Sequence, residues 1–271
     1  MILAERRVTL KSRSQMETMR RAGRLVADVL DRLGEELRPG ITTEDLDRVA
    51  AEMIRDAGAT PSFIGVMMGA GSPYRHTICV SIDDEVVHGI PGRRRIEAGQ
   101  VVSIDAGAIV DGWHGDAART FTVGAVPPEV RLLVQETRRG MDAGIAAARP
   151  GGVVGDIASA VEAVAMERGY GVLREYGGHG IGTEMHEEPF VPNYRAFGRG
   201  RKLEVGLCLA IEPMFTLGRP EVRVRDDGWT VATADGSLAA HWEQTIAILP
   251  EGHEVLTANG RDVSLSGEAG V

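Results

Sequence analysis

Two segments in the first half of the sequence match two segments in the second half at nearly the same offset, and this internal repeat limits the folds that the chain can adopt. A first alignment, of Arg38 with Arg149, places RPGITTEDL (38–46) over RPGGVVGDI (149–157). A second alignment, of Arg94 with Arg201, places RRIEAGQVVSID (94–105) over RKLEVGLCLAIE (201–212). Each half then contains a helix, Arg-Pro-Gly, a second helix and an apolar strand that ends in a carboxylate. We interpret the repeat as a duplication with a pseudo-symmetric site between the halves, although short matches also arise by chance.

Hydrophobic periodicity and stop signals predict four helices and several strands. The helices are expected at 15–37, 43–57, 128–148 and 154–168, and the clearest strands at 77–82, 85–88, 101–110 and 113–123. The first two helices should each bury one face, formed by Met19, Ala22, Val26, Val29, Leu33 and Leu37 and by Leu46, Val49, Met53 and Ala57.

The domain boundaries follow from the same pattern. One domain is expected over 15–256, with half-repeats at about 15–125 and 126–250. Residues 1–14 form a preceding segment, and a polar tail over 257–271 is expected to be disordered.

Composition narrows the possible partners and the compartment. The formal net charge of −9 argues against nucleic acid as the main partner, because phosphate contacts need a basic surface. Two cysteines, Cys79 and Cys208, make no disulfide framework and fit a reducing compartment. No apolar run of about 18 residues predicts a membrane span. We therefore expect a cytoplasmic protein that does not contact a membrane. We also expect it to be a monomer.

Two aspartates belong to a predicted hairpin that turns at Asp111-Gly112. In that register Asp116 faces Gly107 and Asp105 faces Ala118, so the two aspartates are diagonal neighbours, roughly 7–8 Å apart at the backbone. Like charges this close need a cation, or one of them must be protonated. A pair of metal ions about 3.5–4 Å apart would fit the span. Either aspartate could instead be a solvated turn residue, which is the interpretation we adopt for Asp111.

Three further residues offer metal-binding atoms. Glu212 ends the strand LCLAIE, Glu243 interrupts HWEQTIAIL, and His179 lies in GGHGIG, where glycines allow close approach. Each alone could be an ordinary surface residue. Together with the aspartates they form an oxygen-rich set that favours divalent manganese, iron or cobalt over a structural zinc site. The sequence has no CxxC, HExxH or GxxxxGK[ST] motif.

Eight short segments occur in an order and spacing that resemble the pita-bread metallopeptidases, and within them the type I methionine aminopeptidases, over about residues 8–250. The segments are EVVHGIP (85–91), SIDAG (103–107), DGWHGD (111–116), GGHGIG (177–182), HEEP (186–189), AIEPM (210–214), DGWT (227–230) and WEQTI (242–246). The stretch from His179 to Glu212 is too short to hold the extra subdomain of the type II enzymes.

The resemblance implies an α+β pita-bread fold, in which two pseudo-two-fold related halves form a central antiparallel sheet with helices packed on its outer face. It also implies a cytoplasmic methionyl aminopeptidase. Such an enzyme removes the initiator methionine from nascent polypeptides that have a small second residue, and the ribosome is a possible further partner.

Two divalent metal ions are implied, of cobalt, manganese, iron(II), zinc or nickel. By the family pattern Asp105 would bind one ion, and Asp116 and Glu243 would bridge both. His179 and Glu212 would complete the shell of the other ion. A bridging water would attack the scissile carbonyl, with Glu212 as the general base.

Two more histidines resemble family residues that contact the substrate. His88 and His186 would contact the scissile amide and the substrate backbone and are expected to be catalytic. Either could instead make structural hydrogen bonds.

The methionine pocket is implied less directly. Trp229 resembles a wall residue, and Cys79 falls where the family often has a pocket cysteine, although both could be ordinary core residues. The aromatic-rich loop of the family is replaced by GVMMGAGSPYRH (65–76), in which Tyr74 is a possible remnant. Met185 stands where phenylalanine is common.

Two departures fall next to the last predicted ligand. His241 replaces a glutamine, and Gln244 replaces a histidine. All five predicted ligands are nevertheless present. Two alternatives stay open. One is a related metallo-aminopeptidase or Xaa-Pro peptidase with another selectivity, and the other is a non-catalytic pita-bread module that binds a peptide, a histone or the ribosome.

Overall fold

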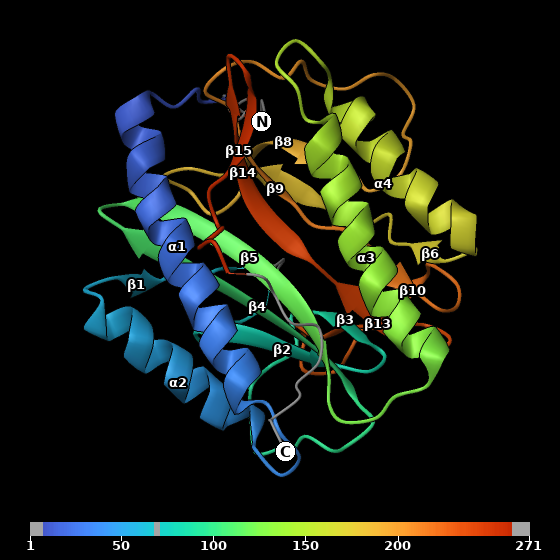
Figure 1. The fold of residues 1–271 in the computed structure, drawn as a ribbon. Helices are drawn as coiled ribbons and strands as arrows, with labels where there is room; N and C mark the ends of the chain where they lie inside the picture. The colour runs from blue at the N-terminus through green and yellow to red at the C-terminus, as the bar shows by residue number, and fades with distance from the viewer. Residues whose placement is uncertain (1–7, 68–70, 262–271) are drawn as a thin grey trace.

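A large antiparallel sheet carries four helices on one face in the computed structural model, which describes residues 8–67 and 71–261 (Figure 1). The helices are α1 (Arg13–Glu36), α2 (Thr43–Asp56), α3 (Pro128–Ala147) and α4 (Val154–Arg168). The main strand order is β1-β4-β5-β14-β9-β7-β8, with β2 on β4 and β15 on β14. Their bounds are β1 (Thr60–Pro61), β2 (Ile78–Ile82), β4 (Val101–Val110), β5 (Trp113–Thr122), β7 (Gly178–Gly180), β8 (Glu187–Val191), β9 (Cys208–Ile211), β14 (Glu243–Leu249) and β15 (Gly252–Val255).

Two three-stranded sheets complete the described fold. One has the order β13-β10-β6 and the other β11-β12-β3. The strands are β13 (Ala239–His241), β10 (Met214–Thr216), β6 (Gly171–Val172), β11 (Val222–Val224), β12 (Val231–Thr233) and β3 (Glu85–Val87). No helix in the described ranges combines the length and apolarity that crossing a membrane requires.

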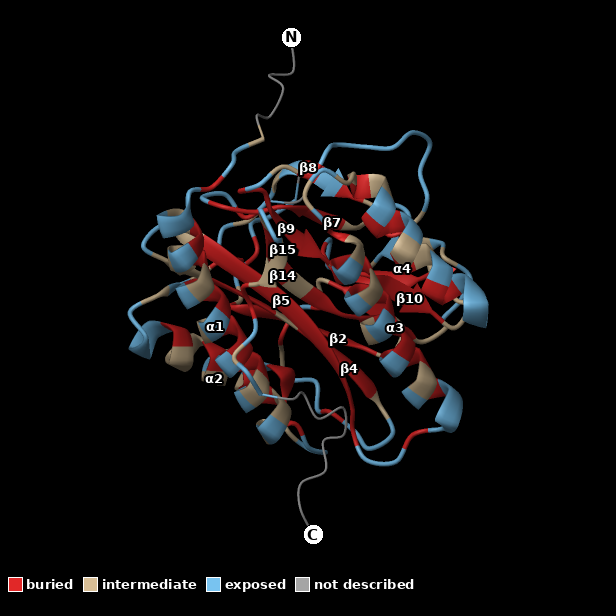
Figure 2. Ribbon diagram, turned by 45° about the horizontal axis from the view of Figure 1, so that its top comes forward, coloured by how far each residue is buried: buried red, intermediate tan, exposed pale blue. Residues whose placement is uncertain are grey.

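Each half of the molecule has its own core between a helix pair and part of the sheet. The first core packs α1 and α2 against β2, β4 and β5, and the second packs α3 and α4 against β9 and β14. Buried residues accordingly lie on the strands and on the inward sides of the helices (Figure 2). Burial of this apolar surface is the main favourable contribution to folding.

The predicted helices are confirmed, and local signals explain their ends. Ser12 and Thr42 cap α1 and α2 with capping boxes, and Gly169 ends α4 in the left-handed conformation. The predicted buried face of α2 is partly wrong. Its fully buried apolar residues are Leu46, Ala50 and Ile54, whereas Val49 and Met53 are half-buried and Ala57 is exposed. Ala57 follows the last helical residue, so it lies beyond the surface that the helix packs on the sheet.

The hairpin of β4 and β5 has the predicted register. Asp105 pairs with Ala118, Gly107 with Asp116, and Val110 with Trp113. Asp111 turns with φ 48° and is exposed, so its interpretation as a turn residue is confirmed.

The two halves repeat the same junction between the N-cap residue of the second helix and the segment that leads into the repeated strand. An isolated antiparallel bridge joins Thr42 to Arg95 in the first half, and a second joins Val153 to Lys202 in the other half. The first alignment of the sequence repeat places Thr42 over Val153, and the second places Arg95 over Lys202. This shared junction supports the duplication.

The two ends of the described chain pack together. A Cβ atom at Gly23 of α1 would lie only 2.4 Å from the carbonyl oxygen of Leu256. Thr257 is buried and accepts a hydrogen bond from the amide of Thr245 at 3.0 Å. Asn259 donates to Asp28 of α1 at 2.9 Å. The folded body therefore continues past 256, and residues 262–271 of the expected disordered tail lie outside the described residues.

Candidate active site

Five predicted metal ligands from five different segments line one cavity of about 430 Å³. Asp105 lies on β4, Asp116 on β5 and His179 on β7, while Glu212 directly follows β9 and Glu243 begins β14. Nε2 of His179 is 3.7 Å from Oδ2 of Asp116 and 3.6 Å from Oε1 of Glu212. The five residues are spread over both halves of the sequence, and the central sheet brings them together.

The backbone sets the orientation of His179. Its Nδ1 donates a hydrogen bond to the carbonyl of Gly180 at 2.9 Å, which leaves the lone pair of Nε2 facing the carboxylates. Burial lowers the pKa of His179 to about 3, so the ring is neutral. The flanking glycines are needed for space. A Cβ at Gly178 or at Gly180 would lie 2.2 Å from a backbone carbonyl oxygen.

The four carboxylates are electrostatically unfavourable as they stand. Burial raises the pKa of Asp105 to about 7, and burial together with the charge of Asp105 raises the pKa of Asp116 well above its usual range. Burial and neighbouring carboxylates also raise the pKa of Glu212 and of Glu243. Among the described residues, no lysine or arginine forms an ion pair with these four groups.

Several oxygens of this cluster also lack hydrogen-bond donors. Oδ1 of Asp105, Oδ1 of Asp116 and Oε1 of Glu243 are buried and have no partner among the described residues. Buried acceptors without donors are rare in folded proteins. Divalent cations would satisfy both the charge and the free lone pairs, so the donor set fits a metal centre.

An apolar cluster lies beside the five predicted metal ligands in the same cavity. Its buried members are Phe63, Tyr74, Cys79, Met185 and Trp229. The rings of Tyr74 and Trp229 meet edge to face with centroids 4.9 Å apart, and Nε1 of Trp229 donates to the carbonyl of Ser72 at 3.1 Å.

All four residues predicted for the methionine pocket are therefore neighbours. Phe63 was not among the pocket residues predicted from the sequence. Its position as an aromatic residue just before the altered 65–76 loop could have indicated it. Residues 68–70 of that loop lie outside the described residues.

The two predicted catalytic histidines line this cavity as well. His88 follows β3 with φ 61°, a conformation that is rare for residues other than glycine and is often found at functional sites. Its ring meets that of Trp229 edge to face at 6.3 Å between centroids. The rings of His186 and His179 are 4.5 Å apart.

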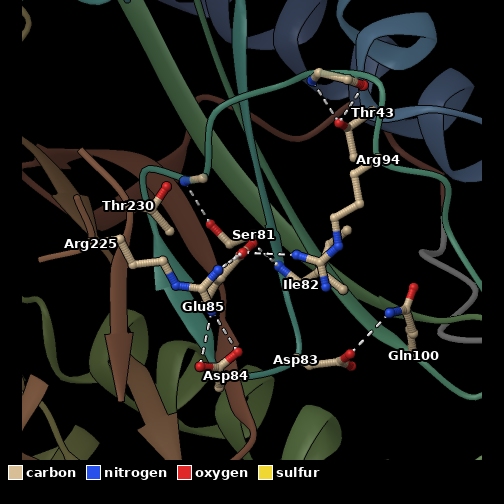
Figure 3. A network of polar contacts seen from close by, with 12 residues as sticks. Thr43, Ser81, Ile82, Asp83, Asp84, Glu85, Arg94, Gln100, Arg225 and Thr230 are labelled. Atoms are coloured by element: carbon tan, nitrogen blue, oxygen red, sulfur yellow. Dashed lines mark hydrogen bonds and ion pairs between the residues drawn. The ribbon is translucent and has the colours of Figure 1, made fainter. Parts of the chain in front are cut away.

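An ion-pair network fixes the segments that carry His88 and Trp229 (Figure 3). Arg225, in the loop between β11 and β12, donates to Glu85 at 2.5 Å and to Asp84 at 2.8 Å. The same carboxylate of Glu85 accepts from Arg94 at 2.8 Å. Because Arg225 lies in the β11-β12 loop and Glu85 lies on β3, the network holds the two segments together. Removing one arginine would leave the negative charge of the buried Glu85 only partly compensated.

A second ion pair, not predicted, anchors the loop of His186. Nζ of Lys11 is 2.6 Å from Oε2 of Glu187, and both side chains are almost fully buried. The other oxygen of Glu187 accepts from the amide of Thr183 at 3.1 Å. The segment before α1 thus supports the active-site wall, and a pair so distant along the chain has no signal in local sequence.

His241 was predicted only as a departure from the family pattern, and the structure places it beside two of the predicted metal ligands. Its Nε2 is 3.7 Å from Oε2 of Glu212. Ligand atoms of Glu212, His241 and Glu243 all lie within 4.8 Å of one another.

Comparison with known proteins gives a consistent result. The pattern of metallopeptidase family M24 matches residues 17–250. Methionine aminopeptidase of Clostridium perfringens is 45% identical over 250 residues, which cover 92% of this chain and 98% of that protein. Methionine aminopeptidase 1 of Mycobacterium tuberculosis is 46% identical over 257 residues, covering 92% and 95%.

The solved methionine aminopeptidase of Rickettsia prowazekii superimposes with a TM-score of 0.89 at 35% identity, covering 93% of this chain and all of that one. The fold and the donor set are those of a metallopeptidase. The chain belongs to metallopeptidase family M24 and, within it, to the methionine aminopeptidases. The pita-bread fold and the family resemblance are thereby confirmed.

Proposed function

We propose that the chain removes the initiator methionine from nascent polypeptides whose second residue is small. The observation that carries this proposal is one cavity that combines a buried five-residue donor set with an apolar pocket. The family assignment supports the same activity. Because nascent polypeptides emerge in the cytoplasm, we propose that the protein acts there. A monomeric state and contact with the ribosome stay predictions.

The proposed metal ligands are Asp105, Asp116, His179, Glu212 and Glu243. Two bound divalent ions would polarise the scissile carbonyl and lower the pKa of a water nucleophile. Glu212, whose pKa is raised by burial, is suited to hold the proton that the nucleophile loses. The identity of the two ions is open among cobalt, manganese, iron(II), zinc and nickel.

The remaining residues would bind and orient the substrate. The substrate methionine would enter the apolar cluster formed by Tyr74, Cys79, Met185 and Trp229. We propose that His88 and His186 contact the scissile amide and the substrate backbone. Burial lowers the pKa of His88 to about 4, so a neutral ring is expected near pH 7. A neutral imidazole can both donate and accept a hydrogen bond to an amide.

The direct test follows methionine release from metal-free protein restored with manganese, iron(II) or cobalt. Met-Ala-Ser, Met-Lys-Ser and an Ala-Pro peptide serve as substrates in parallel. Metal-dependent cleavage of Met-Ala-Ser alone would support the proposal. Cleavage of the Ala-Pro peptide alone would favour an Xaa-Pro peptidase. No cleavage with any metal, in protein shown to bind metal, would favour a non-catalytic binding module.

Metal removal is expected to lower thermal stability, because the buried carboxylates then repel one another. At a metal concentration of about 100 times Kd, binding should add about 2.7 kcal/mol to the free energy of unfolding. For a domain of this size that corresponds to roughly 5–10 °C in Tm. Differential scanning fluorimetry with and without manganese measures the shift. An unchanged Tm at saturating metal would contradict a metal site in the folded state.

Met185→Ala is expected to change which first residue is accepted more than it changes metal binding. Met185 is buried in the apolar cluster and is not among the proposed ligands. The larger pocket should reduce kcat/KM for methionine peptides by roughly 10–100-fold, because the substrate side chain loses its contacts with the side chain of Met185. Rates with Met-Ala-Ser and Phe-Ala-Ser peptides measure the selectivity. An equal loss of kcat/KM with both peptides would show that Met185 does not determine which first residue is accepted.

A further inference from the structure

His241 has features that the proposed five-ligand set does not explain. It is 1% exposed, and neither of its ring nitrogens has a hydrogen-bond partner among the described residues. A buried imidazole without partners costs free energy, and buried polar groups in folded proteins are normally satisfied. The imidazole therefore requires an additional partner at this position.

The distances around Glu212 indicate what that partner is. Each oxygen of the Glu212 carboxylate faces one imidazole: Oε1 is 3.6 Å from Nε2 of His179, and Oε2 is 3.7 Å from Nε2 of His241. These separations are too long for hydrogen bonds. Two donor atoms that bind the same cation, each at about 2.1 Å, lie roughly 3–4 Å from each other. His241 thus has the same spacing from Glu212 as the proposed ligand His179.

The internal repeat supports the same conclusion independently. In the first half Asp116 pairs with Gly107 across β4 and β5. Continued by two positions, the second alignment of the repeat places Gly107 over Met214, and Met214 pairs with His241 across β10 and β13. His241 therefore occupies, in the second half, the position that the proposed bridging ligand Asp116 occupies in the first.

We propose that His241 is a sixth protein ligand of the metal centre. Each half of the chain would then provide a metal ligand at this repeated position, Asp116 in the first half and His241 in the second. This inference rests on the proposed metallopeptidase function. The glutamine that the family pattern has here offers only a neutral oxygen, whereas imidazole nitrogen favours cobalt, nickel and zinc over manganese. The centre of this chain should accordingly prefer those metals more strongly than the same centre with glutamine at 241.

The number of coordinated imidazoles in cobalt-loaded protein tests the proposal. A histidine bound to Co(II) gives a strongly shifted, exchangeable N–H signal in proton NMR. The unmodified protein should show two such signals, and His241→Gln should show one. Calorimetric titration of the metal-free proteins should give a cobalt affinity at least about 10-fold lower for His241→Gln, with a smaller change for manganese.

His253→Gln is the matched control, because His253 lies on β15 and its Nδ1 donates to the carbonyl of Ala148 at 3.0 Å, outside the cavity. It should keep both signals and the parent affinity. Two shifted signals in His241→Gln, or a single one in the unmodified protein, would overturn the proposal. The number of signals in the unmodified protein can be measured without any variant, so the test stays decisive even if His241→Gln is unstable.

The two proposals fail in different measurements. Two imidazole signals without release of methionine would support the ligand and contradict the proposed activity. Release of methionine with one imidazole signal would do the reverse.

Discussion

Asp116→Asn is expected to reduce metal-dependent methionine release on the order of 10³-fold or more, with little change in the fold. The loss of one key electrostatic group at a reacting centre typically costs this much. Asp116 is a buried carboxylate 3.7 Å from Nε2 of His179, and its charge adds to burial in raising the pKa of both Glu212 and Glu243. Asparagine keeps the shape but removes the charge that a bridging ligand supplies. The metal-free variant should be at least as stable as the parent, because repulsion within the cluster is reduced.

Asp111→Asn provides the control for the same chemical change. Asp111 is exposed in the turn of the same hairpin, and asparagine tolerates its positive φ. Steady-state rates, metal affinity and Tm should be measured for both variants. Parent-like activity of Asp116→Asn would refute the two-metal interpretation. Equal losses in both variants would point to a general effect of the hairpin.

Gly115→Ala is expected to destabilise the protein by about 3 kcal/mol, because overpacking of a filled core costs roughly this much. A Cβ at Gly115 of β5 would lie 2.6 Å from the backbone nitrogen of Gly23 and 2.8 Å from the carbonyl carbon of Ala22, both in α1. Backbone atoms of a packed helix cannot rotate away as a side chain can. Either α1 must move from the sheet or β5 must bend, and Asp116 is the next residue along that strand.

The corresponding Tm should fall by roughly 6–12 °C. Gly92→Ala is the control, since nothing lies within 4 Å of a Cβ at that position and its φ is not positive. Chemical denaturation and a thermal scan measure both variants. A Gly115→Ala protein as stable as Gly92→Ala would show that α1 and β5 are less closely packed than the structure indicates.

Local signals in the sequence were sufficient for the parts of the fold that depend on local physics. The Asp-Gly turn fixed the register of the β4-β5 hairpin, and caps and glycines fixed the helix ends. Of the strands β6 to β13 in the second half, all except β8 and β9 have only two or three residues, which is too short to show a period-two pattern. Their pairings depend on contacts between distant segments.

The site shows the same division. The hairpin register alone predicted that Asp105 and Asp116 lie close together. The other three predicted metal ligands, His179, Glu212 and Glu243, could be added only because each lies in a short motif of a known family. Phe63 and Lys11 lie outside those motifs, and only the folded chain brings Phe63 to the cavity and Lys11 to Glu187. His241 was visible as an unusual residue, but its position opposite Met214 depends on a strand pairing that the sequence did not predict.

The contact between Gly23 and Leu256 has a consequence for biosynthesis. At about 5–20 residues per second, the ribosome needs roughly 10–50 s to add the part of the chain that separates them. Until then α1 lacks part of its packing surface, and Glu243 is added late in the same interval. A growing copy of this chain therefore lacks one of the proposed metal ligands, and we expect it to be inactive, until this part of the chain has been added. Methionine release from other polypeptides during that interval depends on copies that were completed earlier.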